Sequence, residues 1–154
     1  MSDVLRKQLE KAPFLTQLSA KDKEGILREL TAFLVGQRVV AEGQQEAVLS
    51  ALMERERKMS TGMQFGVAIP HAKLTDLADL VVAVAVSPKG VEFDALDQKK
   101  THIFVVTLSP VTEVGTHVRF LADISRLLSS VKVRNALIAA KSHEEMMAAL
   151  YNDK

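Results

Sequence analysis

Two short apolar runs in the middle of the chain constrain its fold more than any other feature. Leu80–Val86 and Ile103–Leu108 are rich in valine and isoleucine, and neither alternates between apolar and polar side chains. Such residues favour β-strands, and a strand that is apolar on both faces must be covered on both faces. We therefore predict two central strands, joined by a shorter strand at Val67–Ile69, in a sheet with helices on each side.

The segment before this centre carries helical periodicity. Ser19–Leu34 opens with a capping signature and places apolar residues on one face until Gly36, and Gln44–Arg57 has a similar pattern. The second helix is expected to turn five residues inward: Ala47, Val48, Ala51, Leu52 and Met53. Pro13–Leu18 is too short to assign and fits either a strand or a packed entry arm.

Three further helices are expected after Pro110. Thr116 can cap the first, Val133–Ala140 indicates the second, and Ser142–Glu145 is a capping box that opens the third. Between the two central strands, Ser87–Gly90 is expected to make a turn and Val91–Asp97 could add a strand. The chain has 154 residues without a linker or repeat, so we predict one layered α/β domain over residues 1–154.

Composition and charge exclude several functions. Lys and Arg number 20 against 19 for Asp and Glu, which provides no basic stripe for nucleic acid. There is no cysteine, no His-Glu-x-x-His pattern and no Walker loop, so neither a metal site nor a nucleotide cofactor is expected. No signal peptide is visible and no apolar run approaches the roughly 18 residues of a spanning helix. We expect a cytoplasmic protein without direct membrane insertion.

The stretch Ser60–Lys73 is the most informative for function. Proline fixes its own φ and pushes the preceding residue towards extended geometry, so Ile69-Pro70 is expected to end a strand and to present His71 at its tip. An imidazole aimed in this way could be a nucleophile, because histidine titrates near neutral pH. The alternative is a solvated histidine at a strand end.

The other histidines have weaker arguments. His117 lies in the predicted first turn of a helix, where free N–H groups and the helix dipole favour a phosphate or carboxylate; the alternative is a surface neighbour of the cap. His102 is expected to be a half-buried strand end. His143 lies in the capping box and is expected to be solvated.

Taken in order, these motifs resemble the enzyme IIA family of the bacterial phosphoenolpyruvate-dependent phosphotransferase system. The resemblance is to the mannitol/fructose class, which includes the nitrogen-regulatory enzyme IIA proteins. It covers the chain from about Lys23 onward, whereas residues 1–20 match poorly as an N-terminal arm. The segments that carry the resemblance are Arg55-Glu56, Ser60-Thr61-Gly62, Gly66–His71, Gly90–Asp97 and Thr116–Val118.

This resemblance implies a fold, a reaction and a set of site residues. The fold is a mixed sheet sandwiched between helices. The family's histidine accepts a phosphoryl group from HPr, or from its nitrogen-branch counterpart, and passes it to a IIB partner without a cofactor or metal. Carried over, His71 is the phosphorylated nucleophile, His117 stabilises the phosphate and Arg55 stabilises charge. We expect Nδ1–H of His71 to be held by a carbonyl, with Nε2 open to solvent as the phosphoryl acceptor.

A carrier that docks different proteins in turn needs an apolar patch beside its histidine. Met63, Phe65 and Ala72 are the candidates, and ordinary packing beneath the loop is the alternative for Met63 and Phe65. Ala72 stands where many family members have glycine, and Gln98–His102 replaces a stretch that usually contains proline. These departures leave sugar transport and nitrogen regulation both open. The alternative function is a regulatory binding protein whose partner binding is switched by phosphorylation of His71.

Overall fold

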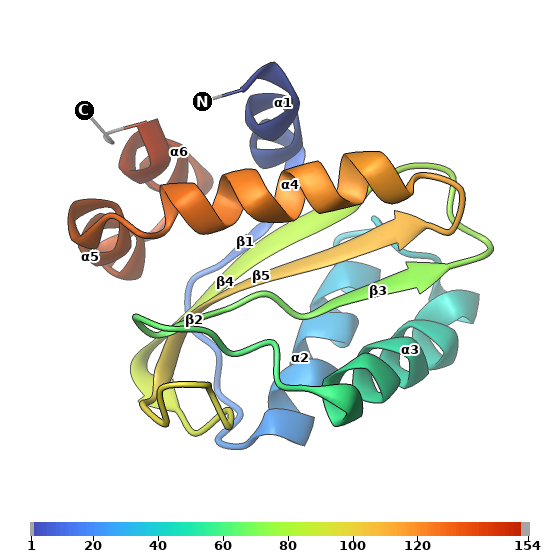
Figure 1. The fold of residues 1–154 in the computed structure, drawn as a ribbon, viewed down its shortest axis with the longest axis horizontal. Coiled ribbons are helices and arrows are strands. Elements are labelled where there is room, and N and C mark those ends of the chain that lie inside the picture. The colour runs from blue at the N-terminus through green and yellow to red at the C-terminus, as the bar shows by residue number, and fades with distance from the viewer. Residues whose placement is uncertain (1, 152–154) are drawn as a thin grey trace.

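The computed structural model describes residues 2–151, apart from the Val114 side chain, and arranges them around one five-stranded sheet (Figure 1). The strand order is β1-β4-β5-β2, and β3 also pairs with β5. β4 and β5 are antiparallel, whereas β1, β2 and β3 run parallel to their neighbours. The sheet is therefore mixed. Its strands are β1 (Phe14–Leu15), β2 (Val67–Ala68), β3 (His71–Leu74), β4 (Val81–Val91) and β5 (Thr101–Pro110).

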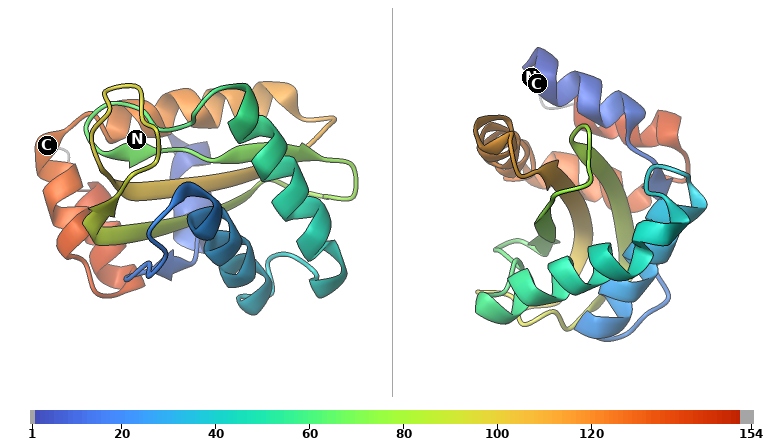
Figure 2. Two further views of the ribbon diagram at one scale, coloured as in Figure 1. Left: turned by 90° about the horizontal axis from the view of Figure 1, so that it is seen from below. Right: turned by 90° about the vertical axis from the view of Figure 1, so that its right-hand side faces the viewer.

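Helices cover both faces of the sheet, as predicted (Figure 2). One face carries α2 (Lys23–Gly36), the 3-10 helix η1 (Glu42–Gln44) and α3 (Gln45–Lys58). The opposite face carries α1 (Asp3–Lys11), α4 (Val114–Leu127), α5 (Val131–Ala139) and α6 (His143–Tyr151). No helix within residues 2–151 is long and apolar enough to cross a membrane. Residue 1 and residues 152–154 of the predicted domain lie outside the described residues.

Burial on both faces explains why the central strands do not alternate in polarity. Val82 and Val84 of β4 pack with α1 and α4–α6, whereas Ala83 and Ala85 pack with α2 and α3. β5 is divided in the same way, since Val105 belongs to the first cluster and its neighbours to the second. Successive side chains of a strand point to opposite faces. Both faces are therefore core, which is why these strands lack polar positions.

The strand that carries His71 differs from the prediction. Val67 of β2 pairs with Ile103, and His71 of β3 pairs with Thr107. Both steps are four residues long, so β2 and β3 follow one path along β5 without a change of register. Pro70 has no N–H, but its carbonyl accepts the Thr107 N–H at 2.9 Å. An edge strand tolerates proline in this way. Pro70 therefore interrupts the strand and does not end it, and His71 is the first residue of β3.

Several helix predictions are confirmed, but two details are wrong. α4 begins at Val114 with Glu113 as its N-cap, so Thr116 lies inside the first turn and does not cap it. Ala47 of α3 is exposed, whereas Val48 and Leu52 are buried. Half of the predicted capping box of α6 is present: the Glu145 N–H donates to Ser142 Oγ at 3.1 Å, but the Glu145 carboxylate accepts from the Ser142 hydroxyl and not from its backbone N–H.

Two segments near the sheet also differ from expectation. Residues 87–90 continue β4 with an irregular register between Val86 and Val91, and Gly90 takes φ 81° there. Residues 92–97 form no strand, so the possible extra strand is absent from this stretch of the described chain. At the N-terminus, α1 was not predicted. Its Ser2 cap accepts the Leu5 N–H at 3.2 Å, and Leu5 and Leu9 are buried.

Candidate functional site

His71 lies half-buried at the free edge of the sheet, where the strand is interrupted at Pro70 and the Ile69 carbonyl is left unpaired with β5. The Pro70 carbonyl points towards β5, so the backbone N–H and carbonyl of Ile69 point away from β5. The Ile69 N–H donates to the Thr61 carbonyl at 3.1 Å. The Ile69 carbonyl oxygen lies 2.8 Å from His71 Nδ1. The interruption of the strand at Pro70 thus leaves the Ile69 carbonyl free to anchor the imidazole ring.

Arg55, in the last turn of α3, contacts the other nitrogen of the ring. Its Nε donates to His71 Nε2 at 3.2 Å, and its Nη1 donates to the Met59 carbonyl at 2.7 Å. A carbonyl only accepts and a guanidinium only donates, so the proton of neutral His71 must be on Nδ1. The predicted Nδ1 anchor is therefore present. Nε2 is not simply open to solvent as predicted, because its lone pair accepts a hydrogen bond from Arg55.

His117 faces His71 from the first turn of α4. The two ring centroids are 5.4 Å apart, with the planes tilted by 58°. His117 is only 3 % exposed, so the alternative of a surface residue is wrong. Its Nδ1 is buried without a hydrogen-bond partner among the described residues. The structure thus brings Arg55, His71 and His117 together from three separate elements.

Both histidines are held neutral by their surroundings. Burial lowers the pKa of His71; the Ile69 hydrogen bond opposes this shift, and the positive charge of Arg55 adds to it. Burial, assisted by His71 and Lys73, lowers the pKa of His117 to about 4. Loss of hydration penalises the cationic form of an imidazole. Neutral His71 therefore keeps the Nε2 lone pair that a nucleophile requires.

A buried ion pair between Lys23 and Glu56 lies next to the site. The sequence analysis assigned it no role. The Glu56 carboxylate accepts the Thr61 N–H at 2.8 Å and the Thr61 hydroxyl at 2.7 Å, and it lies 3.1 Å from Lys23 Nζ. The signal was present in the sequence: Val48, Leu52 and Glu56 are spaced by four residues and share one helix face. A carboxylate on an apolar face must find partners when it is buried.

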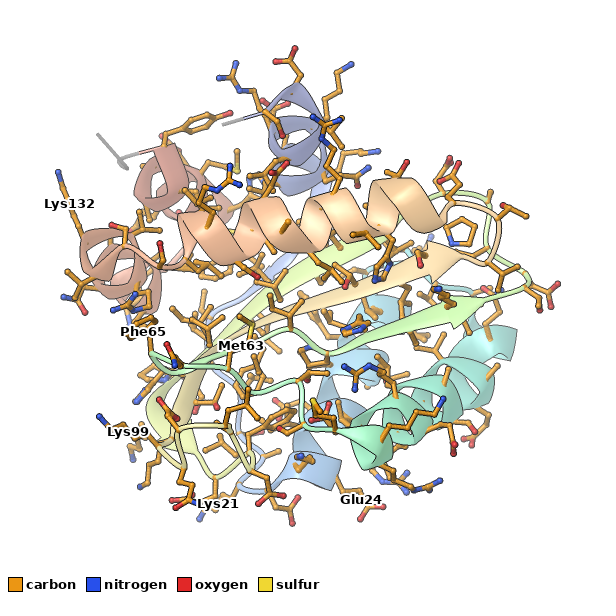
Figure 3. All side chains as sticks on the ribbon, in the orientation of Figure 1. Lys21, Glu24, Met63, Phe65, Lys99 and Lys132 are labelled. Carbon is orange, nitrogen blue, oxygen red and sulfur yellow. The ribbon has the colours of Figure 1, made fainter. Side chains whose placement is uncertain are left out.

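The predicted docking residues have different environments. Phe65 is 57 % exposed at φ 65°, a conformation rare for bulky residues, and the Arg134 guanidinium lies 4.6 Å from its ring centre. Met63 is half-buried next to it on the same loop (Figure 3). Ala72 is only 5 % exposed and packs in the core against α2 and α3. Since Ala72 follows His71 in a strand, it points to the opposite face, and its side chain cannot belong to an exposed patch.

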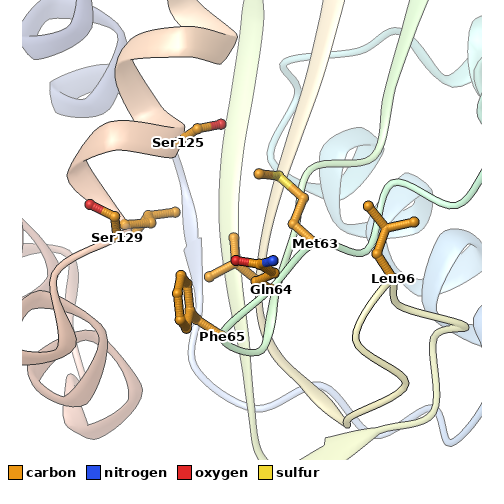
Figure 4. A pocket seen from close by; sticks show the side chains of 8 residues that line it. Met63, Gln64, Phe65, Leu96, Ser125 and Ser129 are labelled. Carbon is orange, nitrogen blue, oxygen red and sulfur yellow. The ribbon is translucent and has the colours of Figure 1, made fainter.

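An apolar pocket of about 330 Å³ opens beside Met63 and Phe65 (Figure 4). Leu96, itself 66 % exposed, lies on one side of it, and Ser125 and Ser129 lie on the other. The loop that carries Met63 leads into β2, which precedes His71 on the same edge of the sheet. The pocket therefore lies on the same edge of the molecule as the site.

The remaining histidines lie elsewhere. His102 is half-buried at the start of β5, with its Nδ1 3.1 Å from the Ser87 carbonyl oxygen, and His143 is exposed at the start of α6. Within residues 2–151, no three His, Asp or Glu side chains gather as metal ligands would.

The geometry favours one kind of chemistry. A neutral imidazole with one nitrogen anchored and the other next to a guanidinium can attack an electrophile and then hold a group that carries negative charge. The mixed sheet between helices is also the fold that the resemblance to the enzyme IIA proteins of the phosphotransferase system implied.

Comparison with known families agrees with this class. Residues 7–153 match the family described as "Phosphoenolpyruvate-dependent sugar phosphotransferase system, EIIA 2", and the chain belongs to this family. The match includes much of the N-terminal arm, which the sequence resemblance did not cover. The chain is therefore a phosphoryl-transfer component of the phosphotransferase system.

Relatives of both functional branches are found. The fructose-specific EIIA component of Haloferax volcanii is 37 % identical over 106 residues, which cover 69 % of each chain. A nitrogen regulatory protein of Bradyrhizobium diazoefficiens is 29 % identical over 88 % of this chain and 87 % of its own length. Among solved structures, the nitrogen regulatory protein IIA-Ntr of Neisseria meningitidis superposes with a TM-score of 0.80 at 27 % identity, covering 92 % of this chain and 94 % of that one. The IIA mannitol protein of Escherichia coli shares the fold, with a TM-score of 0.74 at 19 % identity over 89 % and 94 % of the two chains.

Proposed function

We propose that His71 is a phosphoryl carrier that accepts phosphate from phosphorylated HPr, or from a nitrogen-branch HPr, and passes it to a IIB partner. The observation that carries the proposal is the arrangement of the His71 ring. Its Nδ1–H is bound to the Ile69 carbonyl and its Nε2 lone pair faces Arg55. The ring is thus held in the tautomer that leaves Nε2 as the nucleophile.

The transfer step needs no proton to leave the ring. The Nε2 lone pair attacks the phosphorus of the donor phosphohistidine as the donor P–N bond breaks, and the donor imidazole keeps the electron pair of that bond. Nδ1–H stays bound to Ile69 throughout. Arg55 has further N–H groups in the same plane, so it can turn from Nε2 to the phosphoryl oxygens and stabilise their charge.

His117 completes the proposed site from the opposite side. Its ring is neutral and buried next to His71, so one ring N–H is available to donate to the phosphoryl oxygens. Because the donor is already an activated phosphoramidate, the reaction requires no metal or nucleotide.

We propose that Met63 and Phe65, with the pocket between them and α4, form part of the docking surface for these partners. Exposed aromatic side chains that border an apolar pocket are typical of protein interfaces. The Escherichia coli IIA mannitol protein, 18 % identical with a TM-score of 0.72, has been solved in complex with phosphorylated IIB mannitol. Substituting Phe65 by Ala should raise the KM for the phosphorylated donor and leave kcat unchanged, since Phe65 does not touch His71. A change in kcat alone would contradict this role.

Phosphorylation can be tested directly. The protein is incubated with phosphoenolpyruvate, enzyme I and HPr from a compatible system, and an acid-labile, base-stable label is sought. We expect label on the wild type and on His143→Ala, a control in which an exposed histidine is removed, but none on His71→Ala. An unlabelled wild type, or full label on His71→Ala, would overturn the proposal.

A regulatory role is the second candidate, because the nitrogen regulatory relatives match over most of the chain. In this role, phosphorylation of His71 would switch binding to a regulatory target protein. Affinity capture with phosphorylated and unphosphorylated protein distinguishes the two. A partner captured by only one form supports regulation, whereas a partner list that is independent of the His71 state contradicts it.

A further inference from the structure

We infer that Lys23, Glu56 and Thr61 position the His71 ring for phosphoryl transfer, acting through the backbone of Ile69. The inference rests on the proposed function of His71. None of the three side chains touches the ring, so they are positioning residues and not catalytic ones.

The first part of the connection is the buried ion pair. Glu56 is 6 % exposed and uses both carboxylate oxygens for Thr61, one for its N–H at 2.8 Å and one for its hydroxyl at 2.7 Å. Lys23, the first residue of α2, lies 3.1 Å from the same carboxylate. Thr61 is itself buried. A buried carboxylate with its hydrogen bonds satisfied holds its partners in one geometry, because breaking a bond to Thr61 leaves a buried charged oxygen without that donor.

The second part runs from Thr61 to the imidazole. The Thr61 carbonyl accepts the Ile69 N–H at 3.1 Å, and the Ile69 carbonyl oxygen lies 2.8 Å from His71 Nδ1. The turn itself has little room to shift, since a Cβ on Gly62 would lie 2.9 Å from the Cα of Ala95. Moving Thr61 therefore moves the carbonyl that determines the tautomer and the orientation of His71.

The charge of Glu56 also acts on the ring. The groups that face His71 are Arg55 and Glu56 from α3, Lys73 from β3 and His117 from α4, and Glu56 is the acidic member of this set. A ring phosphorylated on Nε2 that keeps Nδ1–H carries a positive charge, which a nearby carboxylate stabilises. Glu56 is paired with Lys23, and Lys23 Nζ also lies 3.6 Å from the exposed carboxylate of Asp94.

Two pairs of variants separate the geometric effect from the electrostatic one. Glu56→Gln keeps the shape and an acceptor for the Thr61 N–H but removes the charge; Glu54→Gln, from an exposed ion pair with Arg57 on the same helix, is its control. Thr61→Val keeps the shape but removes the hydroxyl, and Thr61→Ser restores a hydroxyl. Circular dichroism shows which variants are folded.

The readouts are the His71 tautomer and pKa by ¹⁵N NMR, the rate of phosphorylation by phosphoramidate, and KM and kcat with phosphorylated HPr. Phosphoramidate needs no protein docking, so it reports on the site alone. For Glu56→Gln we expect the Nδ1–H tautomer to persist and the His71 pKa to fall. For Thr61→Val we expect a mixture of tautomers and a phosphorylation rate lower by about tenfold, with KM for phosphorylated HPr unchanged. Thr61→Ser should recover most of the rate, and Glu54→Gln should behave as the wild type.

The inference is overturned if folded Thr61→Val keeps both the wild-type tautomer and the wild-type rate. This outcome is distinct from failure of the proposed function, in which wild-type His71 would not be phosphorylated at all.

Discussion

The two helices that face His71 differ in how far the hydrogen-bonding groups of their side chains are already used. On the α3 side, Arg55 donates both to His71 and to Met59, and Glu56 is fully engaged by Thr61 and Lys23. On the α4 side, His117 is buried, yet its Nδ1 has no partner within residues 2–151. The α3 side thus holds the imidazole before any ligand arrives, whereas the α4 side retains unused hydrogen-bonding capacity.

The difference follows from the residue types and their places on the helices. Arg55 lies near the C-terminus of α3, where the helix dipole favours a cation and backbone carbonyls are free to accept. His117 lies at the N-terminus of α4, where free N–H groups favour an anion. The two sides should therefore respond differently to substitution.

The largest effect should come from the α3 side. Replacing Arg55 by Met removes the donor to Nε2 and the cation for the phosphoryl oxygens, so kcat for phosphoryl acceptance should fall by up to about 10³-fold. Single-turnover labelling from phosphorylated HPr measures it. Arg57→Met, in an exposed pair on the same helix, is the control and should be near wild type. If Arg55→Met retained most of the rate, the α3 side would not be the one that prepares the ring.

The next effect is a pH dependence of stability from the α4 side. The pKa of His117 is about 4 in the folded state against 6.5 for a free histidine. Between these values the unfolded chain binds more protons, so the free energy of unfolding falls as the pH is lowered from 6.5 towards 4. The contribution is up to about 3 kcal/mol, since each pKa unit corresponds to about 1.4 kcal/mol.

Urea unfolding near neutral pH and near pH 4 tests this dependence. His117→Gln should reduce the pH dependence and leave the part that comes from the lowered pKa of His71, whereas His143→Gln, an exposed control, should leave the profile unchanged. An unchanged profile in His117→Gln would mean that burial of His117 does not carry the effect.

A smaller effect is expected on the reaction itself from His117. His117→Ala removes one hydrogen bond to the phosphoryl group but leaves Arg55 and the Nδ1 anchor in place, so kcat should fall by about tenfold with little change in KM. Rapid-quench phosphorylation separates the two parameters. A loss larger than that of Arg55→Met would reverse the order of the two sides.

The smallest effect should come from Thr107, the β5 partner of His71. Its hydroxyl is buried without a hydrogen-bond partner among the described residues. Replacing such a hydroxyl by a methyl group of similar shape is nearly neutral, so Thr107→Val should change stability by less than about 0.5 kcal/mol. Urea unfolding measures this change. A loss of stability above about 2 kcal/mol would show that the Thr107 hydroxyl is hydrogen-bonded in the folded protein.

Much of the fold could be predicted because its signals are local. The valine-rich runs identified β4 and β5, and apolar periodicity with capping residues identified α2, α3 and α6. α1 was not predicted because its burial rests on only two leucines. The cap of α4 was misplaced because threonine is a common cap, whereas Glu113 begins this helix without a side-chain hydrogen bond.

The candidate site was predictable only in part. His71 could be found from its proline, but nothing in the spacing of Arg55 and His117 indicates that they approach it, and they were selected by family resemblance. The role of Ala72 was mistaken because it depends on which face of β3 it occupies, and that follows from the pairing with β5.

The sequence alone therefore determined a covered sheet, the helices around it and a histidine set in place by proline, because these depend on hydrophobic period and on the restricted backbone of one residue. The tertiary structure decided how the ring is used. It brought the Ile69 carbonyl to Nδ1, Arg55 to Nε2 and His117 to within 5.4 Å, from elements far apart in the chain. Hydrogen bonds and burial act through distance in space, so the tautomer and the lowered pKa of His71 are properties of the folded protein.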